Sequence, residues 1–230
     1  MKREMIGGLP SKVLGLLIDE LEKLRSGKIL VSELEKFLKR QDPFKNDEGV
    51  IGEWREFYRK HFGIELEQEI KIPERTEDQK KEFTHLLIIA KGLTNNIVSD
   101  VCKNNFPCYK YAEDLDKAVP TNERDPKNGT YAIWVRDVVE ADEVHKNKSA
   151  DTIKQENFKT ETLLERMLHE LVYFFENREH LDIKNVTLCS GSRNSDGNVL
   201  GVNWDGCKFG VGWISTEYSN EHLRCREVVC

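Results

Sequence analysis

One amphipathic segment in the second half of the chain constrains the fold more than any other feature. From Thr160 to Asn177 the chain reads TETLLERMLHELVYFFEN, and its apolar residues recur at intervals of three and four, which is the period of an α-helix. Thr162 and Glu165 have the spacing of a capping box, which specifies where the helix starts. One face of this helix must be buried, and it carries Leu164, Met167, Leu168, Leu171, Phe174 and Phe175.

Three short apolar segments follow this helix, and turn signals separate them. They cover residues 185–190, 200–204 and 207–214, with Asp196-Gly197 and Asp205-Gly206 in the intervals. Asp-Gly favours a tight hairpin because glycine adopts positive φ without steric cost. The pattern therefore predicts an antiparallel meander with one apolar face. We expect an α+β domain, in which the helix near 162–177 packs on a mostly antiparallel sheet.

The glycines at 206, 210 and 212 have two interpretations. A glycine inside a strand marks either a β-bulge or a place where a partner approaches the backbone closely. The β-bulge is the interpretation that the sequence favours.

Two motifs of this region, TLLERM (162–167) and LDIKNVTLCSGSR (181–193), are followed by an Asp-Gly pair. In this combination the chain resembles a group of bacterial hypothetical proteins that have no assigned function. The similarity extends from about Phe83 to Arg226. It implies one inherited domain, and it brings no activity, ligand or catalytic residue.

The N-terminal part of the chain has the pattern of helices. Residues 11–25 and 32–40 each carry apolar residues on one helical face, which predicts a helical hairpin. The polar stretch 42–49 contains a proline and predicts a domain boundary. We therefore expect a helical hairpin region over residues 1–45 and an α+β domain over 46–230, with one continuous domain as the alternative.

The segment between these regions predicts further strands and a helix. Residues 84–90 form a compact apolar run that suits a buried strand, and Thr94 is a good cap for a helix that follows. Residues 130–136 (TYAIWVR) are rich in apolar and β-branched residues and predict a strand of the main sheet.

Composition and charge exclude several classes of protein. A chain of 230 residues that is 38% hydrophobic can bury a core. Its 35 basic and 41 acidic residues give a formal net charge of −6, so it lacks the basic surface that is typical of nucleic-acid-binding domains. We find no segment with the length of a membrane span or the apolar run of a signal peptide. The six cysteines do not have zinc-site spacings, so we expect free thiols and a cytoplasmic location.

The densest acidic group of the chain follows the strand predicted at 130–136. It consists of Asp137, Glu140, Asp142 and Glu143, with His145 beside them. Closely spaced carboxylates beside a histidine suit a divalent metal, which can activate water for phosphoryl chemistry. Arg193 and His169 would complete such a site if the fold brought them near. A solvated acidic loop is the interpretation that the sequence favours, because no nuclease or phosphatase motif accompanies the group.

Ser190, Ser192 and Arg193 form a second candidate site, for an anion. Small hydroxyl groups, a glycine and an arginine offer several hydrogen-bond donors to a carboxylate or a phosphate. The same residues equally suit a hairpin loop. No G-x-S-x-G motif is present, and the element after Ser192 is predicted to be a strand, which argues against a hydrolase nucleophile.

The sequence favours a non-enzymatic binding or interaction protein, because amphipathic helices and aromatic residues are plentiful and no specific catalytic motif occurs. The expected partner is another protein; nucleic acid stays open, and a membrane is not expected. No cofactor is predicted. The first alternative is a divalent-metal-dependent phosphoryl-transfer or nuclease-like enzyme that uses Asp137, Glu140, Asp142 and His145. The second is a nucleic-acid accessory protein. Whether the chain is an enzyme is left open.

Overall fold

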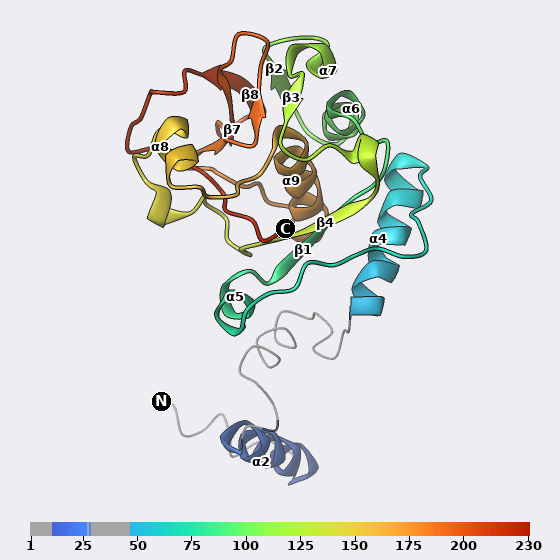
Figure 1. Cartoon of the computed structure of the whole chain (residues 1–230). Coiled ribbons are helices and arrows are strands. Elements are labelled where there is room, and N and C mark those ends of the chain that lie inside the picture. Colours follow the sequence, from blue (N-terminus) through green and yellow to red (C-terminus); the bar gives the residue numbers. More distant parts are fainter. Residues whose placement is uncertain (1–10, 27, 29–46) are drawn as a thin grey trace. The chain divides into compact units, whose positions relative to one another are not determined.

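The computed structural model describes residues 11–26, 28 and 47–230 (Figure 1). The chain divides into two compact units, residues 1–53 and 54–230. In the first unit, helix α2 (Ser11–Arg25) confirms the helix that the sequence predicts there. The second helix predicted at 32–40 lies outside the described residues, so the helical hairpin stays a prediction.

Helix α4 (Asp47–Phe62) begins in the first unit, and its residues from Trp54 onward belong to the second. The division between the units thus falls later than the boundary predicted near residue 45. Trp54 and Tyr58 are buried, and they donate side-chain hydrogen bonds of 3.2 and 2.7 Å to carbonyl groups of strand β1 (His85–Ile89). Side chains of α4 therefore occupy one edge of this strand.

Strand β1 pairs antiparallel with β4 (Tyr131–Val135) in a two-stranded sheet of its own. The prediction that residues 130–136 lie in the main sheet is therefore wrong. The reason lies in the two edges of the pair. Helix α4 covers the edge of β1, and Trp134 of β4 exchanges backbone hydrogen bonds of 2.9 and 3.0 Å with Val229. These contacts occupy backbone groups that another strand would need.

Helix α9 (Leu163–Asn177) is the predicted amphipathic helix, and it contacts both β1 and the main sheet (Figure 1). The predicted capping box is present. The Thr162 hydroxyl accepts from the Glu165 amide at 3.3 Å, and the Glu165 carboxylate accepts from the Thr162 amide at 2.8 Å. Burial goes beyond the predicted stripe, because every residue from 163 to 173 is buried, polar ones included. The polar face of this helix therefore packs against protein.

The main sheet consists of five strands: β2 (Cys108–Lys110), β5 (Val186–Cys189), β7 (Val199–Trp204), β8 (Phe209–Ile214) and β9 (Leu223–Arg224). Their spatial order is β2-β8-β7-β5-β9. Strands β5, β7 and β8 form the predicted antiparallel meander. The edge strands pair in parallel, β2 with β8 and β9 with β5, so the sheet is mixed. Helices and mixed strands together confirm the predicted α+β class.

The three glycines of this region have different roles. Gly206 lies in the turn before β8 with φ of 91°, a conformation that other residues rarely adopt. Gly210 and Gly212 lie inside β8, and the pairing of β8 with β7 runs without interruption from Phe209 to Ile214. The bulge interpretation is therefore wrong for Gly210 and Gly212, because a bulge inserts an unpaired residue into the register.

The two faces of the main sheet have different covers. Helix α9 lies on the inner face, and α8 (Ala150–Gln155) covers part of the outer face through a cluster of Ala150, Leu188, Val199 and Leu223. The outer face near β2 and β8 remains open as a groove. In the described part of the chain no helix is both long and apolar enough to cross a membrane.

Short elements connect these layers. Helix α6 (Asn95–Asn105) begins after Thr94, the cap that the sequence predicts, and packs against α9. The others are α5 (Glu77–Glu82), α7 (Leu115–Ala118), the paired strands β3 (Thr121–Asn122) and β6 (Ser192–Arg193), and the 3-10 turns η1 (Pro126–Asn128) and η2 (Glu143–His145).

Candidate functional site

The acidic residues that follow β4 do not lie together as one cluster. Asp137 is exposed. The Glu140 carboxylate accepts hydrogen bonds from the Lys184 amide at 3.1 Å and from the Asn185 side chain at 2.8 Å, so it fastens a neighbouring loop. Two of the predicted residues, Asp142 and His145, do lie together.

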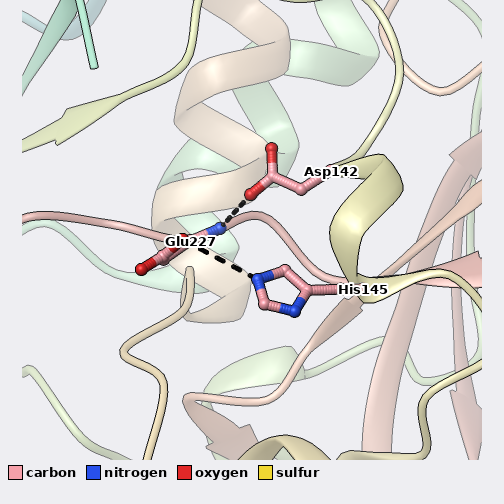
Figure 2. Close-up of side chains that lie close together, drawn as sticks. All are labelled: Asp142, His145 and Glu227. Carbon is pink, nitrogen blue, oxygen red and sulfur yellow. Dashed lines mark hydrogen bonds and ion pairs between the residues drawn. The ribbon is translucent and has the colours of Figure 1, made fainter. Parts of the chain in front are cut away.

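Asp142 and His145 lie close to a third residue, Glu227 (Figure 2). Glu227 belongs to the segment after β9, residues 225–230, which we call the C-terminal segment. One potential ligand atom of each side chain lies within 4.8 Å of the others. The turn η2 fixes the positions of Asp142 and His145 relative to each other, because the His145 amide donates to the Asp142 carbonyl oxygen at 3.0 Å. The Glu227 amide donates to Asp142 Oδ2 at 2.7 Å, which fixes the C-terminal segment beside the turn. Sequence reasoning missed Glu227, which lies 85 positions from Asp142.

His145 is the unusual member of this group. Its side chain is fully buried, and neither Nδ1 nor Nε2 has a hydrogen-bond partner in the described structure. The ring packs edge-on against Phe158 with centroids 4.5 Å apart, and Nε2 lies 3.8 Å from Glu227 Oε2. A buried polar group without a partner costs about 1–3 kcal/mol. Nδ1 of His145 has no partner among the described residues, and Nε2 has only its ion-pair contact with Glu227.

Arg136 is the counter-ion of both carboxylates. Its guanidinium donates to Asp142 Oδ2 at 2.6 Å and to Glu227 Oε2 at 3.1 Å, and it also contacts the carboxylate of Glu82 at 2.9 Å. Burial raises the pKa of Asp142, while the Glu227 amide and Arg136 oppose that rise. Both Arg136 and the Glu227 amide bond to the same oxygen of Asp142, Oδ2. The group thus keeps acceptor atoms that Arg136 does not use.

The predicted anion site is built differently from what its residue types suggest. The Ser192 hydroxyl accepts from the Leu163 amide at 2.9 Å and donates to the Asn122 side chain at 2.6 Å, so it braces the first turn of α9. The Arg193 guanidinium donates to the carbonyl oxygens of Ser190 and Ser192, both at 2.8 Å. Burial lowers the pKa of Arg193. The Arg193 donors thus bond within their own loop and the Ser192 hydroxyl donates to β3, whereas the buried Ser190 hydroxyl has no hydrogen-bond partner among the described residues.

The polar face of α9 carries a buried network of charges. Arg166 pairs with Asp182 at 2.9 Å and with Glu170 at 3.0 Å, and Arg226 pairs with Asp182 at 2.7 Å. His169 lies here, 2.8 Å from Glu161, and not with Asp142 and His145. All of these side chains are buried, so the network offers no surface to a substrate. No sequence signal separates these charges from an ordinary solvated helix face.

A groove of about 390 Å³ lies on the open part of the outer sheet face, over β8 and its neighbours. Its floor contains Gly210 and Gly212, and the half-exposed ring of Tyr109 stands on the neighbouring strand, directly beside Gly210 in the register. Polar side chains at the groove are Asn203, Asp205 and Lys208. The volume is in the range of small-molecule sites. The glycines of this strand are the part of the groove for which the sequence offers a close approach by a partner as an interpretation.

In comparisons with known proteins, no family model, no curated protein and no solved structure matches this chain. The groove and the group of Asp142, His145 and Glu227 are therefore the two candidate sites of this chain.

Proposed function

We propose that this chain is a non-enzymatic binding protein, and that the groove over β8 takes a small, uncharged ligand that contains a ring, such as a sugar or a nucleoside. The observation that carries the proposal is Gly212, a glycine in the groove floor that the fold itself does not require. The expected location is the cytoplasm, because the six cysteines are free thiols, which suits a reducing compartment.

The fold gives no internal reason for glycine at this position. A Cβ atom added at Gly212 would meet nothing within 4 Å, and one added at Gly210 would make only ordinary contacts of 3.6 and 3.8 Å with Asn203. Neither residue has the positive φ that favours glycine. Glycine inside a strand costs about 0.5–1 kcal/mol relative to alanine. The remaining reason is access: a molecule outside the chain can approach this backbone closely.

The charges and the walls of the groove favour a neutral, ring-shaped ligand. Lys208 Nζ lies 3.7 Å from Asp205 Oδ2, so the two side chains compensate each other and the groove attracts neither anions nor cations strongly. The half-exposed ring of Tyr109, whose centroid lies 5.7 Å from Lys208 Nζ, packs well on flat apolar surfaces. The Asn203 side chain and the Asp205 and Lys208 pair supply donors and acceptors for hydroxyl groups at the rim. A sugar or a nucleoside has both features.

Substitution of Gly212 by valine is expected to remove binding without loss of stability. The β-branched side chain fits a strand and meets open space, so the free energy of unfolding stays the same or rises by about 0.5–1 kcal/mol. It fills the floor of the groove, so affinity for the ligand should fall at least roughly tenfold, which corresponds to about 1.4 kcal/mol. Saturation-transfer NMR with methyl glucoside and with adenosine as probes measures the affinity.

The matched control is Gly52→Val, because Gly52 also has open space around its Cβ position but lies in α4 and does not line the groove. This variant should bind the probes as the unmodified protein does. Two results would contradict the proposal: neither probe binds at millimolar concentration, or a probe that binds does so equally well in the Gly212→Val protein. In the second case the probe occupies another surface.

A further inference from the structure

We propose that Asp142, His145 and Glu227 bind a divalent transition-metal ion, with Zn²⁺ and Mn²⁺ as the best candidates. This site is separate from the groove and does not depend on the function proposed for the groove. One imidazole nitrogen and two carboxylate oxygens converge there from turn η2 and from the C-terminal segment (Figure 2). Such a mixed nitrogen and oxygen set suits Zn²⁺ and Mn²⁺ better than Mg²⁺, which prefers oxygen ligands alone.

The independent observation is the state of His145. A histidine with no exposed surface normally has hydrogen bonds for its ring nitrogens, but Nδ1 and Nε2 of His145 have none among the described residues. Nε2 points toward Glu227, and the distance of 3.8 Å to Oε2 is too long for a hydrogen bond. Two ligands of one tetrahedral Zn²⁺ ion are roughly 3.3 Å apart, given bonds of about 2.0–2.2 Å. A small inward movement of the carboxylates would therefore reach ligand geometry.

Arg136 holds the two carboxylates together when no ion is bound, because its positive charge offsets their mutual repulsion. It bridges Asp142 and Glu227 through one oxygen of each, and its bond to Glu82 gives the guanidinium a partner on the exposed side. An incoming cation competes with this arginine, because both are attracted to the same two carboxylates. We therefore expect moderate affinity, and occupancy that depends on the concentration of free metal.

The experiment is thermal unfolding of the full, chelator-treated chain, with and without millimolar Zn²⁺, Mn²⁺ or Mg²⁺. A ligand at about a hundred times its dissociation constant raises the melting temperature by roughly 5 °C for a chain of this size. We expect such a shift with Zn²⁺ or Mn²⁺ and a smaller one with Mg²⁺. Isothermal titration calorimetry should give one ion per chain.

Three variants locate the ion. His145→Phe keeps the packing against Phe158 and removes the unpaired nitrogens, so without metal it should melt at the same or a higher temperature. Glu227→Gln keeps an oxygen for Arg136. Both should lose the metal-dependent shift. Asp137→Asn alters an exposed carboxylate of the same loop and should keep it.

A shift that persists in His145→Phe and in Glu227→Gln would overturn the proposal, because the ion would then bind elsewhere. The absence of any shift in the unmodified protein would overturn it too. Gly212→Val should retain the full shift, so failure of the groove and failure of the metal site give different results.

Discussion

Replacing Asp182 by asparagine is expected to lower the free energy of unfolding by about 3–5 kcal/mol, because breaking a buried ion pair leaves charge uncompensated. Asp182 lies between two buried guanidinium groups, 2.9 Å from Arg166 and 2.7 Å from Arg226. Burial opposes ionisation of this carboxyl, but the two arginines hold its pKa below the ordinary value. Asparagine keeps the shape and tolerates the left-handed backbone at φ of 54°. After the change, Arg166 keeps its ion pair with Glu170.

Urea unfolding at neutral pH measures this loss, and Asp100→Asn is the control. Asp100 is exposed on helix α6, so its substitution should change the free energy of unfolding by no more than about 0.5 kcal/mol. A loss below about 1 kcal/mol at Asp182 would contradict the expectation. It would mean that Arg226 is satisfied by the carbonyl oxygens of Val138 and Val139, which it already contacts at 3.0 and 2.6 Å.

The elements with local signals could be predicted from the sequence. Helix α9 follows from its apolar period and from the capping pair Thr162 and Glu165, which depend only on residues within a few positions. The meander of β5, β7 and β8 follows from two Asp-Gly turns, and both turn glycines, Gly197 and Gly206, have positive φ. Such signals act over one turn or one hairpin, so a single sequence is sufficient to read them.

The partners of polar residues could not be predicted, because they depend on contacts between distant segments. Arg166 lies on the face of α9 that the sequence pattern assigns to solvent, yet Asp182 and Arg226 cover that face. The same limit applies to strand β4. Its apolar run predicts a buried strand correctly, but the choice of β1 as its partner depends on how α4 and the C-terminal segment close the two edges.

The candidate sites show the same division between local and distant information. Asp142 and His145 are three residues apart in one turn, so the sequence could nominate them together. Glu227 carries no signal of its own, and the fold alone brings it to them. In the groove, the glycines of β8 were visible in the sequence, whereas Tyr109 reaches them only through the parallel pairing of β2 with β8. Residue types in the sequence indicate where a site can form, and the packing of distant segments determines which side chains belong to it.

Glu161 and His169 form a buried pair whose protonation differs from that of exposed side chains. Glu161 Oε1 lies 2.8 Å from His169 Nδ1, and the other carboxyl oxygen of Glu161 has no partner among the described residues. Burial raises the pKa of Glu161 to about 8 and lowers the pKa of His169. Both shifts favour uncharged side chains at neutral pH, with the proton on Glu161 donated to the imidazole nitrogen.

Substitution of Glu161 by glutamine is expected to stabilise the protein increasingly as the pH rises. In the unfolded chain Glu161 ionises near the ordinary glutamate pKa of 4.5, whereas in the folded chain its pKa is raised to about 8, so it keeps its proton up to about that pH. Between these values the folded state binds more protons, so the free energy of unfolding of the unmodified protein falls by up to about 1.4 kcal/mol per pH unit. Glutamine mimics the protonated carboxyl and does not titrate. Urea unfolding at pH 5, 6.5 and 8 should therefore show a difference between variant and unmodified protein that grows by roughly 3 kcal/mol, since the other titrating groups cancel. A difference that stays constant with pH would mean that Glu161 ionises in the folded protein as it does in water.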